Sequence, residues 1–129
     1  MSKHRTIIPK GFEFFYESFH FAPAVKVGKT IYCSGQIGWA GPGHKAPADP
    51  KEQFTLAFEN LRRVLEAAGA DFGDVVEITS FHVGMEHLGV FGKVKDDYLK
   101  EPYPAWTAIG SSALAIPGAL VEIRATARL

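Results

Sequence analysis

Two side chains in the second half of the sequence, His82 and Glu122, could move protons. A histidine titrates near neutral pH and can act as a general acid or base, and a carboxylate can take a proton from water. His82 lies beside Ser80 in an otherwise apolar stretch, so a core or interface histidine with a hydrogen-bond partner is the alternative. Glu122 lies in the closing strand, where a solvated or ion-paired glutamate is the alternative.

A third candidate, Trp106, lies in the segment PYPAWTAIG, residues 102–110. Pro102 and Pro104 each fix their own φ angle and disfavour a helical conformation at the preceding residue. We therefore expect a rigid turn that leads into the last strand. The indole offers one N–H donor and a large apolar face, so Trp106 could bind a ligand or simply pack at an interface.

The sequence contains no motif of the common catalytic or cofactor-binding classes. A nucleophile elbow, a dinucleotide fingerprint and a zinc-ligand spacing are all absent. The glycine-rich residues 34–43 lack the lysine and hydroxyl residue of a phosphate loop, so we expect a strand end followed by a loop. The single cysteine, Cys33, lies in an apolar run and is expected in the core. We therefore predict no metal site and no cofactor.

The composition disfavours several classes of partner. Fourteen Lys and Arg residues balance fourteen Asp and Glu residues, which argues against a basic nucleic-acid-binding surface. No apolar stretch approaches the length of a membrane span, and the N-terminus lacks the apolar region of a signal peptide. We therefore expect a cytoplasmic protein without nucleic-acid or membrane partners. The 129 residues, 47% of them hydrophobic, fit one domain spanning residues 1–129.

Two segments carry the clearest secondary-structure patterns. Residues 24–38 form two short apolar runs around Gly28, which predicts a β-hairpin. An amphipathic helix is predicted to begin at Asp49, with Pro50 at its first position, and to end at Gly69. We expect this helix to cover one face of a sheet.

Residues 74–84 are apolar at successive positions, as in a strand that is covered on both faces. A weaker helix follows, and the chain closes with a strand of clean alternation. This order predicts an α+β fold with two helices on one face of a sheet. Because Val76, Ile78 and Ser80 are expected on the other face, we predict that a partner subunit covers them.

Three segments, in this order, resemble the Rid family, also called YjgF/RidA or L-PSP: VKVGKTIYCSGQIG, ENLRRVLEAAGADFGDVVEITSFHV and GALVEIRATA. The resemblance runs from about Pro23 to Leu129 and implies a chorismate-mutase-like fold with a mixed β-sheet. It also implies a homotrimer with a small-molecule ligand bound at each subunit interface. The best-known members hydrolyse reactive enamines and imines, such as 2-aminoacrylate, that pyridoxal-phosphate enzymes release.

In that family, an arginine of a Pro-Ala-Arg motif holds the substrate carboxylate, and a glutamate on the last strand positions the attacking water. The resemblance matches Glu122 to this glutamate and Gly35 to a glycine whose backbone approaches the ligand. Trp106 replaces the arginine, and Phe21 replaces a tyrosine. An indole cannot reproduce the paired charge-assisted hydrogen bonds of a guanidinium. We expect carboxylate binding to weaken by about 2–4 kcal/mol.

The pattern around Trp106, with SFH at residues 80–82, resembles the YjgH-like branch, which lacks the arginine and keeps a tyrosine in the place of Tyr16. The resemblance therefore predicts one altered cleft. Glu122 is its expected catalytic residue, and the expected substrate-binding residues are Trp106, Gly35, Phe21, Tyr16 and His82.

Three functions remain open from the sequence. The first is a trimer that binds or hydrolyses a small metabolite other than the standard 2-aminoacrylate-type imine. The second is an enamine or imine deaminase with weakened carboxylate recognition. The third is a binding or structural protein without chemistry. If the protein is an enzyme, we expect a hydrolase that acts on imine-like or enamine-like C–N bonds.

Overall fold

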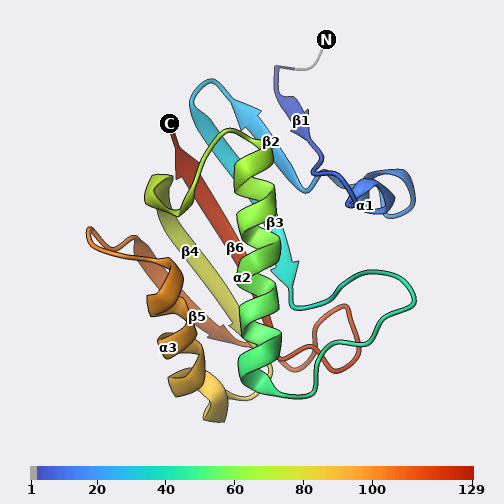
Figure 1. The fold of residues 1–129 in the computed structure, drawn as a ribbon, viewed down its shortest axis with the longest axis vertical. Coiled ribbons are helices and arrows are strands. Elements are labelled where there is room, and N and C mark those ends of the chain that lie inside the picture. The colour runs from blue at the N-terminus through green and yellow to red at the C-terminus, as the bar shows by residue number, and fades with distance from the viewer. Residues whose placement is uncertain (1–2) are drawn as a thin grey trace.

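The computed structural model describes residues 3–129 and consists of a six-stranded sheet with two longer helices on one face (Figure 1). The helices are α1 (Glu13–Glu17), α2 (Pro50–Ala67) and α3 (Leu88–Tyr98), with short 3-10 turns η1 (Phe72–Asp74) and η2 (Met85–His87). The strands are β1 (Arg5–Ile7), β2 (Ala24–Val27), β3 (Thr30–Ile37), β4 (Val75–His82), β5 (Ala105–Gly110) and β6 (Val121–Arg128).

The spatial order of the strands is β1-β2-β3-β6-β4-β5. Only β4 and β5 run parallel, and every other neighbouring pair is antiparallel. The predicted α+β fold, with a mixed sheet and two helices on one face, is therefore confirmed. No helix in the described part of the chain is long and apolar enough to cross a membrane.

The predicted hairpin and the predicted core cysteine are both confirmed. β2 and β3 pair across a turn at Gly28, whose φ of +58° lies in the region that favours glycine. Cys33 is buried, and burial raises the pKa of its thiol to about 12, so the thiol stays protonated and unreactive at neutral pH.

The long helix α2 begins and ends where the sequence predicts. The Asp49 carboxylate accepts a hydrogen bond of 3.0 Å from the backbone N–H of Glu52, which satisfies one of the free donors at the helix start. Gly69, with φ of +82°, follows the last turn. On the buried face, Phe54 and Phe58 are fully enclosed, and each contributes about 1.5–3 kcal/mol through burial.

The pairing of β4 with β6 shifts register between Val75 and Glu77, so Val76 forms a β-bulge. The bulge breaks the simple alternation and leaves Val76 half exposed. The prediction that Ile78 and Ser80 lie on the uncovered face is therefore wrong, because both are buried on the helix-covered side.

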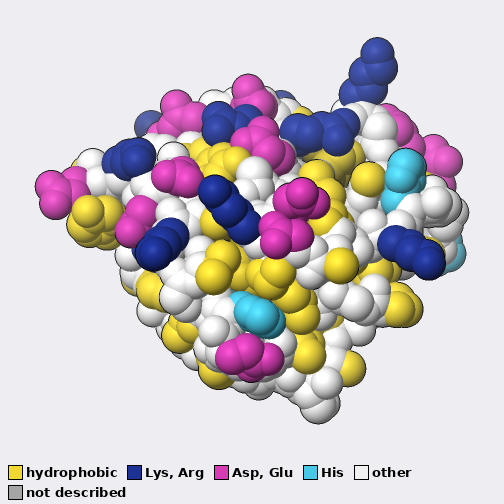
Figure 2. Space-filling model, turned by 60° about the horizontal axis from the view of Figure 1, so that its bottom comes forward, with side chains coloured by type: hydrophobic (Ala, Val, Ile, Leu, Met, Phe, Trp, Pro, Cys, Tyr) yellow, Lys and Arg dark blue, Asp and Glu magenta, His cyan; other side chains and the backbone are white. Residues whose placement is uncertain are grey.

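The helix-free face of the sheet exposes apolar area of its own. Tyr32 and Ile109 on this face keep 50% and 41% of their surface exposed. Figure 2 shows a different view, in which Lys and Arg side chains intermingle with Asp and Glu side chains around a hydrophobic area. No large region of one charge sign is visible in that view.

Apart from the 3-10 turns η1 and η2, three elements were not predicted from the sequence: β1, α1 and β5. β1 and α1 are too short for periodicity to reveal them, with three and five residues. β5 forms within the proline-flanked segment that was expected to be a turn, and it adds a parallel edge strand beside β4. This strand determines where Trp106 points.

Candidate functional site

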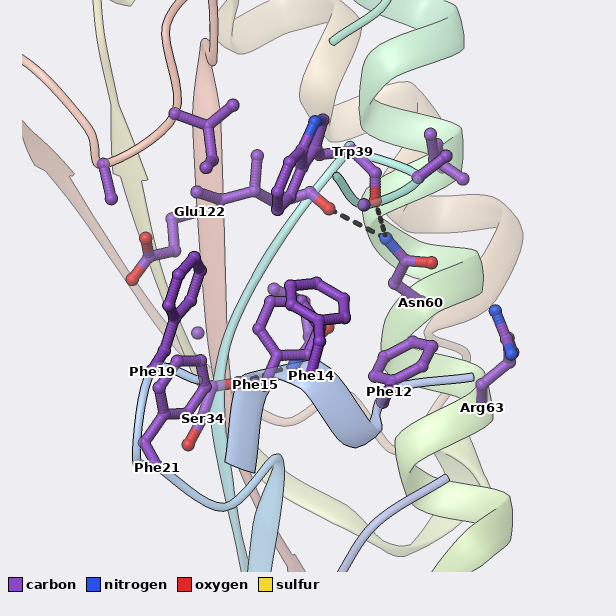
Figure 3. Close-up of a pocket in the computed structure, with 18 of the residues that line it drawn as sticks. Phe12, Phe14, Phe15, Phe19, Phe21, Ser34, Trp39, Asn60, Arg63 and Glu122 are labelled. Atoms are coloured by element: carbon purple, nitrogen blue, oxygen red, sulfur yellow. Dashed lines mark hydrogen bonds between the residues drawn. The ribbon is translucent and has the colours of Figure 1, made fainter. Parts of the chain in front are cut away.

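A cavity of about 400 Å³ lies between the N-terminal segment around α1, the strand β3 and the helix α2 (Figure 3). Aromatic side chains make up much of its lining: Phe12, Phe14, Phe15, Phe19, Phe21 and Trp39. Its polar side chains are Ser34, Gln36, Asn60, Arg63 and Glu122. Apolar walls with a few polar groups are typical of small-molecule sites.

The aromatic side chains contact one another as well as the cavity. The ring centroids of Phe14 and Phe15 are 3.9 Å apart, and those of Phe15 and Phe21 are 5.4 Å apart. The ring of Trp39 stands edge-on to Phe14 at 5.9 Å. Such contacts fix the rings relative to one another, so the apolar wall exists before any ligand binds.

Glu122 lies at one end of the cavity on β6. Its side chain is half-buried, and desolvation raises the pKa of its carboxyl group above the ordinary value. Among the residues that the structure describes, no hydrogen bond or ion pair reaches this carboxylate. A half-buried carboxylate that lies beside a cavity and has no partner in the protein is available to bind a ligand or a water molecule.

Gly35 makes room for that carboxylate. A Cβ atom built at Gly35 would overlap the carboxyl group of Glu122. The pairing of β3 with β6 also shifts register between Cys33 and Gln36, which bends the strand at this point. Gly35 is therefore a position where the site requires the smallest side chain, whereas the approach of its backbone to a ligand stays a prediction.

Two amide side chains of α2 hold the loops that border the cavity. Asn60 Nδ2 donates to the carbonyl oxygens of Ile37 and Trp39, at 2.9 and 3.0 Å. Gln53 is fully buried and donates to the carbonyl oxygens of Pro47 and Gly118, at 2.9 and 3.0 Å. Its own oxygen accepts a bond from the backbone N–H of Leu120 at 2.6 Å.

Trp106 lies on the opposite side of the sheet from Glu122 within one chain. It pairs with Ile78 in the β4–β5 register, on the helix-covered side, whereas Glu122 pairs with Phe81, which faces the other way. The indole Nε1–H donates to Ser80 Oγ at 2.8 Å. The Trp106 side chain is 40% exposed at the sheet edge, because no further strand follows β5.

His82 belongs to the same cluster as Trp106. Its Nε2 lies 2.8 Å from Ser80 Oγ, and its ring packs edge-on against Phe91 of α3 at 4.8 Å. Desolvation lowers the pKa of the imidazole, and its Nδ1 atom is buried without a partner in the described chain. Burial therefore favours the uncharged form of the ring, which suits a core histidine.

The structure thus divides the sequence-predicted site residues of one chain into three groups. Phe21, Gly35 and Glu122 line the cavity. Trp106 and His82 meet through Ser80 on the helix-covered face of the sheet, opposite to Glu122. Tyr16 lies on α1 with 46% of its surface exposed and is not among the cavity-lining residues.

Several cavity residues were missed by sequence reasoning, including Phe14, Phe15, Trp39, Asn60 and Arg63. The one signal available was the density of phenylalanines between positions 12 and 21, which is higher than a short exposed segment needs. Asn60 and Arg63 carried no such signal, because polar positions on an amphipathic helix usually face solvent.

Comparison with known proteins places this arrangement in a family. The chain matches the family model described as Endoribonuclease L-PSP over residues 15–129. It is 34% identical to the RutC family protein YjgH of Escherichia coli (strain K12), over 100% of this chain and 98% of the relative. A solved structure of YjgH matches 99% of this chain and 98% of that chain, with a TM-score of 0.89 and 33% identity.

A second relative has a named activity. The chain is 36% identical to a Mus musculus 2-iminobutanoate/2-iminopropanoate deaminase, over 83% of this chain and 79% of the relative. The predicted resemblance, including that to the YjgH-like branch, is therefore confirmed. The chain belongs to the Endoribonuclease L-PSP family, which is the Rid or YjgF/RidA family.

Proposed function

We propose that the cavity beside Glu122 binds a small metabolite and that Glu122 promotes hydrolysis of a C–N double bond in that metabolite. The observation that carries the proposal is the half-buried carboxylate, which has no partner in the described chain and a raised pKa. A raised pKa brings a carboxylate closer to the range in which a general base works best. Relatives named 2-iminobutanoate/2-iminopropanoate deaminase support this reaction class.

In the proposed reaction, the Glu122 carboxylate takes a proton from water while the water oxygen bonds to the imine carbon. The C–N π electrons pass to the nitrogen, and a tetrahedral carbinolamine forms. Protonated Glu122 then gives its proton to the nitrogen, which leaves a neutral carbinolamine. Glu122 next takes the proton of the carbinolamine hydroxyl and passes it to the nitrogen as the C–N bond breaks, so the O–H electron pair forms the carbonyl bond and the nitrogen leaves as ammonia. The sum is imine plus water giving a carbonyl compound plus ammonia.

The standard 2-aminoacrylate-type imine is not the substrate that we propose. Such a compound carries a carboxylate directly on the reacting carbon, and the family arginine that would hold it is Trp106 in this chain. Next to Glu122, a ligand carboxylate would meet a like charge in a desolvated site, which is unfavourable. The lining residues that the structure describes include one cation, Arg63, and it lies at the far end of the cavity from Glu122 (Figure 3).

We also propose that the protein is a homotrimer with the cavity at a subunit interface. Trp106 and His82 lie on the opposite face of the sheet from Glu122 of the same chain, so only a neighbouring chain could bring Trp106 near Glu122. Exposed apolar side chains on the helix-free face, such as Tyr32, support an assembly that covers them. The balanced charge supports a small molecule, and not a nucleic acid, as the ligand.

The substitution Glu122→Gln tests the reaction. Imines without a carboxylate on the reacting carbon, formed in solution by an amine oxidase from aliphatic and aromatic primary amines, can be trapped with semicarbazide and their decay followed. We expect Glu122→Gln to slow the protein-dependent decay by about 10²–10⁴-fold. Glu77→Gln is the control, because Glu77 lies outside the cavity and accepts a hydrogen bond from Thr126.

Two results would contradict the proposed reaction. In one, Glu122→Gln hydrolyses imines as fast as the wild-type protein. In the other, the wild-type protein accelerates the decay of no imine in the panel above the rate in buffer. A protein that binds without chemistry would then be the better account.

A further inference from the structure

The cavity carries opposite charges at its two ends. In Figure 3, Glu122 lies at one end of the row of labelled phenylalanines and Arg63 lies at the other, beyond Phe12. Both residues line the same cavity of about 400 Å³. A ligand that fills the cavity would therefore touch a carboxylate at one end, aromatic rings along its length and a guanidinium at the other end.

Arg63 is held in place by two contacts that leave part of it free. Its Nη2 atom donates to the carbonyl oxygen of Lys10 at 2.6 Å, and its guanidinium lies 4.6 Å from the ring centroid of Phe12. In the described part of the chain, no carboxylate forms an ion pair with Arg63. The other N–H groups of the guanidinium can therefore bind an anionic group of a ligand.

We propose, on the basis of the function proposed above, that the substrate is an imine whose anionic group is remote from the reacting carbon. An apolar or aromatic spacer would lie along the phenylalanines, the C–N group would lie at Glu122, and a carboxylate would bind Arg63. Arg63 is then the residue that determines specificity, because it recognises the end of the ligand that does not react.

Charge separation in the ligand explains why the site needs no arginine beside Glu122. An imine nitrogen that carries a proton is attracted by the Glu122 carboxylate, whereas a carboxylate on the same carbon would be repelled by it. Moving the carboxylate to the far end of the ligand removes this repulsion and adds an attraction to Arg63. The arrangement thus selects against small α-imino acids and in favour of longer dipolar molecules.

The aryl ketones that such imines would release provide a direct binding test. The probes are 4-acetylbenzoate and the longer 3-(4-acetylphenyl)propanoate, which carry a carbonyl at one end and a carboxylate at the other. Acetophenone lacks the carboxylate, and pyruvate carries it next to the carbonyl. By calorimetry on the full chain, we expect at least one long acid to bind roughly 10- to 100-fold more tightly than both acetophenone and pyruvate.

Variants of neighbouring arginines identify the anchor. Arg63→Gln should remove the advantage of the long acids over acetophenone, and Arg63→Lys should retain part of it because the charge stays. Arg62→Gln is the matched control, since Arg62 pairs with Glu59 and lies over Phe72 on another part of α2. Circular dichroism checks that each variant folds, and the comparison of probes on the wild-type protein needs no variant.

The outcomes separate this inference from the proposed reaction. If the long acids bind no more tightly than acetophenone, or Arg63→Gln leaves their advantage intact, remote-anion recognition is wrong even when imine hydrolysis depends on Glu122. If the long acids bind tightly through Arg63 and no imine is hydrolysed, the ligand class is supported and the proposed reaction is wrong.

Discussion

Glu122 and Ser80 lie on opposite faces of the same sheet and use their hydrogen-bonding capacity in opposite ways. Ser80 is fully buried, and its hydroxyl group contacts both Trp106 Nε1 and His82 Nε2 at 2.8 Å. Glu122 borders a cavity, and its carboxylate has no partner in the described chain. Satisfied buried groups stabilise a fold, whereas an unsatisfied group beside a cavity is available for a ligand.

This difference also changes how the tryptophan is understood. The sequence suggested that Trp106 marks the ligand site because it replaces an arginine. In the structure, the indole donates a hydrogen bond to Ser80, its ring is tilted against that of Phe91 with the centroids 5.9 Å apart, and Lys95 Nζ lies 4.8 Å from its ring centroid. Within one chain it completes an internal network, and a contact with ligand stays a prediction that requires a second subunit.

Apart from the substitution of Glu122 itself, the largest effect is expected for Gly35→Ala, which tests the cavity side of the comparison. The new methyl group would displace the Glu122 carboxylate, so turnover should fall by about 10²-fold or more. The free energy of unfolding should fall by about 1–3 kcal/mol because of overpacking. Both can be measured, by imine decay and by urea denaturation.

A second substitution shows whether Glu122 alone causes that loss of stability. The three atoms closest to the added Cβ all belong to Glu122, so in a Glu122→Ala background Gly35→Ala should cost much less stability. Gly89→Ala is the control, because a Cβ there meets nothing within 4 Å. An undiminished loss in the double variant would mean that the backbone, and not the carboxylate, requires glycine.

Ser80→Ala should have the next largest effect, and it tests the hydrogen-bonded cluster of Ser80, Trp106 and His82. The substitution leaves Trp106 Nε1 and His82 Nε2 without their partner, at a cost of about 1–3 kcal/mol in the free energy of unfolding. Ser112→Ala in an exposed loop should be near neutral. If Ser80→Ala reduced turnover without reducing stability, the contrast between Ser80 and Glu122 would be wrong, because the hydrogen bonds of Ser80 would then serve the catalytic site.

Trp106→Phe should have a smaller effect of the same kind. The ring remains and only the N–H donor is lost, so we expect a decrease of about 0.5–1.5 kcal/mol in the free energy of unfolding. In a Ser80→Ala background, the same substitution should cost almost nothing, because its partner is already gone. Equal losses in both backgrounds would show that packing, and not the hydrogen bond, keeps Trp106 in place.

The smallest effects concern the dependence of the free energy of unfolding on pH. Glu122 and His82 should contribute slopes of opposite sign. Burial raises the pKa of Glu122, so the folded state holds a proton that the unfolded state has lost, and stability falls as pH rises above about 4.3. Burial lowers the pKa of His82, so the unfolded state takes up a proton first, and stability falls as pH drops below about 6.5.

Urea denaturation from pH 4 to pH 8 measures both slopes. Relative to the wild-type protein, Glu122→Gln should gain stability as pH rises through the lower part of this range. His82→Gln should lose less stability than the wild-type protein on acidification, whatever its absolute stability. Slopes of equal sign would mean that the two groups do not differ in burial as the structure indicates.

Elements with long, regular patterns could be predicted from the sequence, and elements defined by distant partners could not. The helical spacing of apolar residues that includes Phe54, Phe58 and Leu61 continues to Leu65 on the 18-residue α2, which is typical of an amphipathic helix. β5 exists because it pairs with β4, more than 20 residues earlier, and no local pattern records that pairing. The bulge at Val76 likewise depends on β6, so the faces of β4 were assigned incorrectly.

The candidate site shows the same limit. Glu122 and Gly35 could be named from motifs, because the family resemblance gave their positions in the sequence. The aromatic wall could not, since Phe14, Phe15 and Trp39 come together through the path of the chain around α1 and not through any spacing. Arg63 could not be named for a related reason: its neighbour Arg62 has the same residue type but packs elsewhere.

The amide side chains of Gln53 and Asn60 bear on how such a site can change in evolution. Both bind only backbone atoms, at the end of β3 and in the loops that border the cavity. Loop side chains can therefore be replaced without losing these bonds, provided that the backbone keeps its path. The helix α2 thus fixes the backbone of these loops, while the loop side chains that line the cavity can be substituted. Proteins with this scaffold can therefore differ in the molecules that they bind and still form the same hydrogen bonds to the loops.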